Sequence, residues 1–423
     1  MAENDIYKNK ERFERMVSQM DSWINPALKH PRGRKTRTHY IKYQENLKYF
    51  YKLLPIWEMK DLSYVRRVRL LNVMLLITSI PDKDLKDCDR DDINRIVAYM
   101  HTRYNTLSSK KGFILNIKVI WRSLFPELDH KGRIDETIAP YAVRHLSGKI
   151  DKSKQKRRNE KYTIEELQSI IQFFDKDPQI QAYITSIHET FVRPQELSYL
   201  KIRDIEFFDN YGLANISEHG KEGCKMIQFE NLSYPYILKW YRQHPLKHDP
   251  DAFFFISQSN HNRYQQLNNL AVNKRIKHAC KVLGINKRIT CYSFKRMGIT
   301  LDRMNGVPDK IIISKAGWTT GKQLSTYDLG TQSEALRMSL IRKGLVKPET
   351  LEEQKFEPKQ KKCGFCDYLN SYADKLCGGC MRPLNREHMQ KMEQSHQKLM
   401  SNELLSRIDK LETALQEKLE GSM

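Results

Sequence analysis

The sequence predicts a mainly α-helical protein with a small β-sheet, an α+β fold divided into more than one domain. The chain has 423 residues, which is more than one hydrophobic core usually accommodates. Over most of residues 40–125 and 160–345, apolar residues recur at the three- and four-residue spacing of amphipathic helices. Only residues 212–230 alternate well enough for paired strands. These patterns favour helical domains with one small sheet.

The first helical region, residues 40–130, contains amphipathic segments whose polar faces are rich in lysine and arginine. The segments are residues 40–54, 64–78, 91–104 and 111–125. A basic N-terminal arm, residues 1–39, precedes them and is interrupted by Pro31 and Gly33. We expect a helical domain with a basic surface.

A charged linker, residues 131–160, leads into a second region, residues 161–346. This region opens with Thr163 and Glu166, the pattern of a helix capping box. Pro194 suits the first turn of a later helix. Further expected elements are strands within 212–230, a short apolar strand at 252–256, and helices at 178–188, 234–243, 265–283, 292–305, 308–316 and 332–343.

The composition restricts the possible functions. The formal net charge of +22 indicates a polyanionic partner, and nucleic acid is the commonest one. An anionic membrane is the alternative, but the longest mainly apolar run, residues 70–80, is about half the length that spans a bilayer. The first residues lack the basic-then-apolar order of a secretory signal, so we expect a cytoplasmic protein without a membrane partner.

Four of the eight cysteines form two Cys-x-x-Cys pairs, namely Cys363, Cys366, Cys377 and Cys380. In an intracellular protein such clustering indicates metal binding before disulfides. Four thiolates around one zinc ion make a closed, structural site that leaves no position for a substrate. We therefore expect a zinc-ribbon-like module at residues 361–384, followed by a C-terminal amphipathic helix within 385–423.

Residues 190–330 contain candidates for the parts of a phosphodiester cleavage that uses no metal. This reaction needs a nucleophile, positive charge beside the non-bridging oxygens, and an acid for the leaving oxygen. Arg193, which Glu196 can brace, offers a planar fork to a phosphate. Lys221, at the tip of the expected hairpin, can donate a proton. Lys295 and Arg296 lie in the first turns of an expected helix.

Trp318 and Tyr327 complete this set of candidate residues. An indole N–H is a pure hydrogen-bond donor, suited to one phosphate oxygen. Tyr327 is the candidate nucleophile. A tyrosine hydroxyl, with an ordinary pKa of about 10, is mostly neutral at pH 7, so nearby cations must favour the phenolate. A phosphotyrosyl bond retains the energy of the broken bond, so the chemistry needs neither ATP nor a cofactor.

Residues 190–205, 219–229 and 292–327 resemble the three boxes of the tyrosine recombinase (phage integrase) family, in its archaeal Xer-like branch. The resemblance implies that residues 161–346 are a recombinase catalytic domain. It also implies that residues 40–130 are the family's core-binding (SAM-like) DNA-binding domain.

The resemblance also assigns roles. Arg193 matches the first family arginine, Lys221 the hairpin lysine, Trp318 a position held by His or Trp, and Tyr327 the nucleophile. It implies a site-specific recombinase or integrase that cleaves and rejoins double-stranded DNA through a 3′-phosphotyrosyl intermediate, acting as a tetramer on DNA.

One departure from the family pattern bears on the chemistry. The family box His-x-x-Arg reads here as Tyr292-Ser293-Phe294-Lys295, followed by Arg296. The second phosphate-binding cation is therefore either Lys295, a point charge, or Arg296.

Two other functions remain open on the sequence. The departures at Tyr292 and Lys295 suit a catalytically impaired relative that acts as a DNA-binding regulator. A type IB topoisomerase would share the phosphotyrosyl chemistry but relax supercoils instead of exchanging strands.

Overall fold

The computed structural model describes residues 8–25, 39–135, 137–149, 159–217 and 223–385, with parts of 390–411. The chain divides into two compact units, Met1–Arg157 and Arg158–Met423. The fold is mainly helical with small antiparallel sheets, as the sequence predicted.

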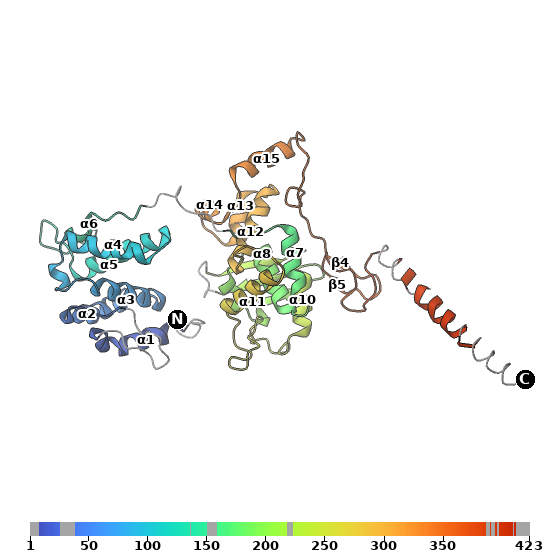
Figure 1. The fold of residues 1–423 in the computed structure, drawn as a ribbon, viewed down its shortest axis with the longest axis horizontal. Helices are drawn as coiled ribbons and strands as arrows, with labels where there is room; N and C mark the ends of the chain where they lie inside the picture. Colours follow the sequence, from blue (N-terminus) through green and yellow to red (C-terminus); the bar gives the residue numbers. More distant parts are fainter. Residues whose placement is uncertain are drawn as a thin grey trace, which may run out of the picture. The chain divides into compact units, whose positions relative to one another are not determined.

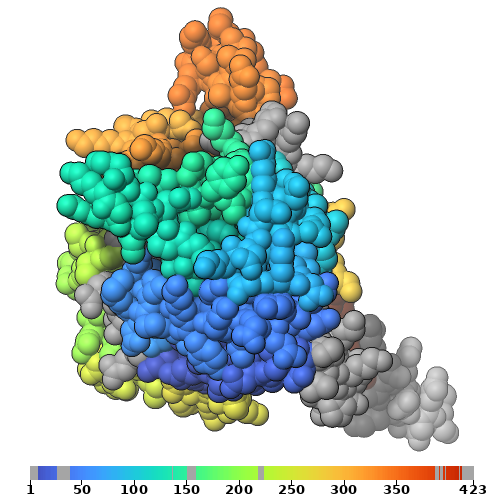
Figure 2. All heavy atoms as spheres, turned by 90° about the vertical axis from the view of Figure 1, so that its left-hand side faces the viewer, coloured from blue at the N-terminus to red at the C-terminus, as the bar shows by residue number. Residues whose placement is uncertain are grey.

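The first unit is built from helices, as Figure 1 shows, and Figure 2 shows one face of it, coloured blue to green. Its helices are α1 (Asn9–Ser18), α2 (Leu47–Met59), α3 (Tyr64–Thr78), α4 (Arg90–Arg103), α5 (Leu107–Leu124) and α6 (Tyr141–Arg144). Helix α3 is the centre of this unit: from Leu70 to Thr78 every residue except Asn72 is buried. Helices α2 to α5 confirm the four predicted segments. Helix α1 falls within the predicted basic arm and was not anticipated, because Phe13 is its one buried side chain.

The second unit combines helices with a small sheet (Figure 1). Its helices are α7 (Ile164–Phe173), α8 (Pro178–Thr190), α9 (Pro194–Ser198), α10 (Tyr234–Gln243), α11 (Asn269–Val282), α12 (Cys291–Met304), α13 (Asp309–Ala316), α14 (Leu324–Tyr327) and α15 (Gln332–Arg342). Strands β1 (Ile205–Phe207), β2 (Gly212–Ile216) and β3 (Lys225–Phe229) form one antiparallel sheet in that order.

Helix α8 is the central element of the second unit. Every residue from Pro178 to His188 is buried, and α12 packs directly against α8, as Figure 1 shows. The approach is close because α12 carries Gly298 at the crossing, where an added Cβ would lie 2.0 Å from the His188 carbonyl oxygen. The two helices therefore hold a fixed spacing at the middle of this unit.

The predicted strand at residues 252–256 is wrong. The segment makes only isolated bridges, between Lys201 and Phe253 and between Ile256 and Gln266. Its apolar character has another cause, because Phe254 and Phe255 are fully buried in the core. A short apolar run does not distinguish a strand from a buried loop.

The segment after α15 packs back against α7 and α10 of the same unit. Glu352 Oε1 accepts a hydrogen bond from the Ile164 backbone N–H at 2.6 Å. Two short paired strands follow, β4 (Lys361–Lys362) and β5 (Leu369–Asn370). Leu369 joins the main core, and the Tyr236 hydroxyl on α10 donates to Ser371 Oγ at 2.8 Å. The cysteine segment is thus anchored on α10.

Beyond residue 385, the described residues are helical over 397–408 and expose Leu399, Leu404, Leu405 and Ile408. Among the helices that the structure describes, none has the length and apolar character needed to cross a membrane.

Candidate active site

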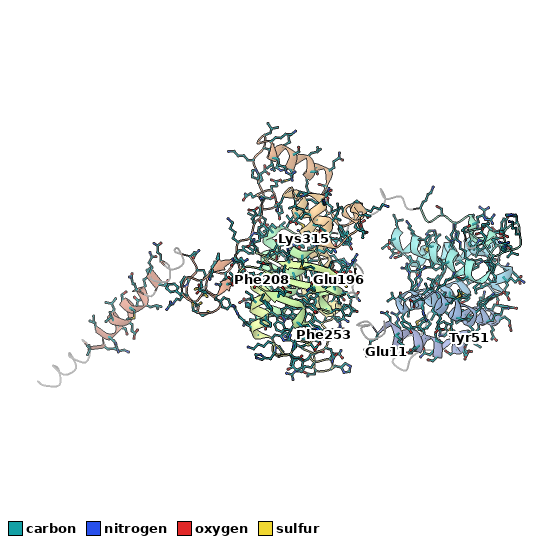
Figure 3. The ribbon with its side chains drawn as sticks, turned by 180° about the vertical axis from the view of Figure 1, so that it is seen from behind. Glu11, Tyr51, Glu196, Phe208, Phe253 and Lys315 are labelled. Atoms are coloured by element: carbon teal, nitrogen blue, oxygen red, sulfur yellow. The ribbon has the colours of Figure 1, made fainter. Side chains whose placement is uncertain are left out.

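Arg193 is positioned by a sharp reversal of the chain after α8. Phe191 ends that helix in the left-handed conformation, with φ of 55°, which a non-glycine residue adopts only when its surroundings enforce it. Arg193 then precedes α9, and Glu196 Oε2 accepts a hydrogen bond from the Arg193 backbone N–H at 2.9 Å. The Arg193 guanidinium lies 3.6 Å from Glu196 Oε1. Figure 3 shows Glu196 in the middle of the second unit.

Lys225, at the start of β3, joins the same carboxylate. Its Nζ lies 2.8 Å from Glu196 Oε2 and donates to the Ala316 carbonyl oxygen at 3.2 Å. Burial lowers the pKa of Lys225, while Glu196 opposes that shift. Lys221, the lysine expected here from the sequence, lies outside the described residues.

Sequence reasoning assigned no role to Lys225, although a signal for it existed. In β3, Ile227 and Phe229 are buried and alternate with exposed residues. Lys225 stands two residues before Ile227, so it shares the inward face of the strand. A lysine at an inward strand position requires a buried partner, and Glu196 is that partner.

Gly317 explains the first half of the Gly-Trp pair. It ends α13 in the left-handed region, with φ of 71°, which favours glycine. A Cβ at this position would lie 2.6 Å from Lys225 Cδ. Gly317 therefore permits both the chain reversal and the passage of the Lys225 side chain.

Lys295 and Arg296 occupy different surroundings on α12. Lys295 is fully buried, and its Nζ has no hydrogen-bond acceptor among the described residues. Burial, followed by the charges of Lys225 and Arg193, holds the pKa of Lys295 well below its ordinary value. Arg296 is paired with Glu160, which also accepts a hydrogen bond from Ser293 Oγ at 3.0 Å.

The rings of Trp318 and Tyr327 pack against each other beside Lys295, tilted by 45°. Their ring centroids are 5.0 Å apart, and Lys295 Nζ lies 5.2 Å from the Trp318 ring and 5.1 Å from the Tyr327 ring. The Arg296 guanidinium carbon is 5.8 Å from the Tyr327 ring. Trp318 is buried, and its indole N–H meets no acceptor within the described part of the chain.

The segment around Tyr327 is fastened to α12. The Leu329 backbone N–H donates to Thr300 Oγ1 at 2.8 Å, and Asp328 pairs with Arg303. Both partners belong to α12, which also carries Lys295. The structure thus brings five of the six residues predicted from the sequence into one neighbourhood, namely Arg193, Lys295, Arg296, Trp318 and Tyr327.

Tyr292, in the position of the family histidine, also lies beside this group. Burial raises the pKa of Tyr292, and the charge of Arg193 opposes that shift. Tyr292 is therefore a neutral hydroxyl at physiological pH and a poor proton acceptor.

These residues lie in a region that matches a known protein family. Residues 161–332 match the phage integrase family. The phage integrase domain begins just before α7 and ends at the start of α15, so it contains all of the residues just described except Glu160. No match to the chain is found among curated proteins.

Solved structures share the fold of the phage integrase domain and of much of the remaining chain. A XerH site-specific recombinase in a post-cleavage complex with a palindromic difH substrate is 14% identical, with a TM-score of 0.53 over 78% of this chain and 94% of that one. A lambda integrase (75–356) dimer bound to a COC′ core site is 16% identical, with a TM-score of 0.52 over 67% of this chain and 96% of that one. At these identities the likeness establishes the fold alone.

The cysteine segment forms a second candidate site. The sulfur atoms of Cys363, Cys366, Cys377 and Cys380 all lie within 4.8 Å of one another. The Cys363–Cys380 and Cys366–Cys377 sulfur pairs are 3.7 and 3.5 Å apart. A disulfide would bring two sulfurs to about 2 Å, whereas zinc bonds of about 2.3 Å in a tetrahedron place them roughly 3.8 Å apart. These four thiols can bind a metal ion.

The surroundings of the cysteines fit a thiolate site. The Gly379 backbone N–H donates to Cys377 Sγ at 3.3 Å, and Asn370 Nδ2 lies 3.7 Å from the same sulfur. Donors of this kind stabilise the negative charge of thiolate ligands and fix their orientation.

Proposed function

We propose that this protein is a site-specific DNA recombinase of the integrase type, which cleaves and rejoins strands through a 3′-phosphotyrosyl intermediate on Tyr327. The observation that carries the proposal is the grouping, within the phage integrase domain, of buried cations around one half-buried tyrosine, together with an indole N–H that has no acceptor among the described residues. The finer likeness to the archaeal Xer-like branch and a cytoplasmic location belong to the same proposal.

The roles follow from the positions of the side chains. Arg193 holds the non-bridging phosphate oxygens with its planar fork, and the Trp318 indole donates to one of them. Lys225, or Lys221 four residues before it in the sequence, gives a proton to the leaving 5′ oxygen. Lys295 occupies the place of the second family arginine, and Arg296, held by Glu160, adds positive charge behind the tyrosine ring.

Double-stranded DNA is the proposed partner, with a tetramer as the working assembly. The net charge of +22 supports a polyanionic ligand, and DNA binding should weaken steeply with salt as phosphate contacts release counterions. Among the structures with this fold is a lambda integrase tetramer bound to a Holliday junction, with a TM-score of 0.51. We propose that residues 40–130 and the phage integrase domain both contact the duplex, with residues 131–160 as their linker and 1–39 as a basic arm.

We also propose that the four cysteines hold one structural zinc ion within the module at residues 361–384. The ion would be held by Cys363, Cys366, Cys377 and Cys380, and would supply no chemistry at Tyr327, because four thiolates leave no open position. Its contribution is to fix a segment that already shares the core through Leu369. The C-terminal helix, within 385–423, is proposed to be a contact element of the assembly.

A trapping experiment tests the recombinase. Purified protein is mixed with a pool of duplexes that carry a nick beside randomised sequence, so that cleavage releases a short strand and the covalent adduct accumulates. We expect DNA that stays attached to wild-type protein in detergent, and none with Tyr327→Phe. Sequence-specific binding without an adduct would instead indicate a regulator.

The DNA sequence selected in this experiment is then used to distinguish a recombinase from a topoisomerase. Formation of junctions between two copies of the site supports strand exchange. Relaxation of a supercoiled plasmid without junctions would identify a type IB topoisomerase.

A further inference from the structure

We propose that Lys295 is the general base that takes the hydroxyl proton of Tyr327 when a scissile phosphodiester enters the site. This inference rests on the proposed function and assigns to Lys295 a role that an arginine in its place could not perform. It begins from the position of the amine, which lies over the ring of the nucleophile and has no acceptor among the described residues.

The charges that face Lys295 come from several elements. Helix α9 contributes Glu196, preceded by Arg193, β3 contributes Lys225, and α14 contributes Tyr327. The carboxylate of Glu196 is already engaged by Lys225 at 2.8 Å and by the Arg193 backbone N–H. Lys295 therefore lies beside two cations and next to a carboxylate that is already bonded elsewhere.

The remaining titratable neighbours do not supply a counter-charge. On α12 itself, Arg296 is paired with Glu160, and Tyr292 is held neutral by burial, which raises its pKa. On α8, His188 is buried with a pKa lowered to about 3 by burial, and its Nδ1 lies 2.9 Å from the Tyr162 hydroxyl.

These surroundings favour the neutral form of the amine over the ammonium ion. Loss of its hydration and the nearby positive charges both disfavour the ammonium ion, which is why the pKa of Lys295 lies well below its ordinary value. A neutral amine has a lone pair and can accept a proton. A guanidinium stays protonated at any physiological pH and cannot.

Entry of DNA changes the balance. A phosphodiester brings one negative charge into the group, which favours the ammonium form of Lys295. The proton moves from Tyr327 Oη to Lys295 Nζ, and the electron pair left on Oη forms the bond to phosphorus. The bond from phosphorus to the 5′ oxygen breaks, and its electron pair stays on that oxygen. The 5′ oxygen then takes a proton from the Lys225 ammonium. Rejoining reverses each transfer, with the incoming 5′ hydroxyl as the nucleophile.

The geometry permits this transfer. Lys295 Nζ is 5.1 Å from the centre of the Tyr327 ring, and the side chain has four rotatable bonds. A change of rotamer, or one intervening water, places the amine within reach of the hydroxyl.

The test uses the nicked duplex that wild-type protein selects from the randomised pool. The single-turnover cleavage rate of Lys295→Arg is compared with that of the wild type between pH 6 and 9. General-base catalysis typically contributes about 100-fold or more, so Lys295→Arg is expected to be slower by at least about 100-fold and to lose the rise of rate with pH. A mere phosphate contact predicts the opposite, because arginine binds phosphate at least as well. Lys295→Arg cleaving as fast as wild type, with the same pH profile, would overturn the proposal.

A second variant avoids the larger guanidinium. Lys295→Ala leaves a space for small added bases, and we expect its cleavage to be restored by ethylamine in proportion to the free-base form. Restoration by guanidinium instead would indicate that only positive charge is needed, and would also overturn the proposal. The control is equal DNA binding by the variants and the wild type.

These experiments distinguish the recombinase activity from the role of Lys295. If the wild type forms no adduct that depends on Tyr327, the recombinase proposal fails. If it forms one while Lys295→Arg remains fully active, only the role of Lys295 is lost.

Discussion

Substitution of Gly317 by alanine should uncouple Lys225 from the site without replacing any charged residue. Gly317 has φ of 71°, and a Cβ added to it would lie 2.6 Å from Lys225 Cδ. Gly344 is a matched control, because it has the same φ of 71° and nothing within 4 Å of its added Cβ. Both variants incur the left-handed penalty, and only Gly317→Ala displaces the lysine.

The magnitudes follow from the two geometries. A non-glycine residue in the left-handed region costs roughly 1–2 kcal/mol, so Gly344→Ala should lower the free energy of unfolding by about that much. In Gly317→Ala the Lys225 side chain must shift by about 1 Å to reach ordinary van der Waals contact. Its bond to Glu196 Oε2, 2.8 Å long in a buried setting, is then lost or lengthened. An unsatisfied buried partner adds about 1–3 kcal/mol to the cost.

The assay is urea unfolding followed by tryptophan fluorescence, together with single-turnover cleavage of the nicked duplex. Gly317→Ala is expected to be less stable than Gly344→Ala and to cleave at least about 100-fold more slowly, the size of a lost general acid. Gly344→Ala should cleave at the wild-type rate. Equal losses of stability and of cleavage in the two variants would refute the reasoning, because strain alone would then account for both.

Three further outcomes are expected. Lys295→Met should raise the free energy of unfolding by about 1–3 kcal/mol at pH 7, because it removes a buried donor that has no acceptor among the described residues. The gain should shrink as pH rises toward 10.5, because between the folded and unfolded pKa values of Lys295 the unfolded wild type binds more protons, so the stability of the wild type increases with pH. Urea titrations at several pH values check this, and a gain independent of pH would contradict it. Elemental analysis should find one zinc ion per chain, and a chelator should lower the melting temperature of wild-type protein but not of a Cys363→Ser, Cys380→Ser double variant, which should already melt lower; metal-free protein with an unchanged melting temperature would contradict the zinc site. Because the Tyr327 ring packs against Trp318 of its own chain, with the ring centroids 5.0 Å apart, cleavage should occur in cis, so mixing Tyr327→Phe with Arg193→Ala protein should yield no adduct, and recovery of an adduct would indicate cleavage in trans.

Much of the fold could be read from the sequence, because the periodic burial of side chains specifies helices directly. Helix α10 occurs at the predicted residues, and α12, α13 and α15 begin or end within one residue of prediction. The false strand at 252–256 and the unanticipated strand β1 have a common reason. A run of five residues or fewer carries too little pattern to separate an edge strand from a buried loop, and only the tertiary neighbours decide.

Some residues of the site could be predicted from the sequence, and others could not. Arg193, Trp318 and Tyr327 could be found because their spacing and order are properties of the chain. Lys225 was missed although it stands two residues before the buried Ile227 and so shares the inward face of β3; the register of the hairpin, with Ile216 opposite Lys225, agrees with that placement. The difference between Lys295 and Arg296 was also hidden, since it depends on Glu160, which lies far away in the sequence and pairs with Arg296.

The arrangement around Tyr327 destabilises the free protein, and a bound phosphodiester would remove that cost. Lys295 Nζ and the Trp318 N–H are both buried donors without an acceptor in the described chain, and each such donor costs about 1–3 kcal/mol. Arg193 and Lys225 share the single carboxylate of Glu196. A phosphodiester has one negative charge and two non-bridging oxygens with several lone pairs, so it can satisfy both donors and balance the excess charge at once. A sulfate or carboxylate could balance the charge as well, but, of these three anions, only the phosphodiester brings an electrophilic phosphorus to the tyrosine oxygen. The free energy that is unfavourable in the free protein is therefore recovered when the reacting phosphodiester binds, which favours the state that reacts.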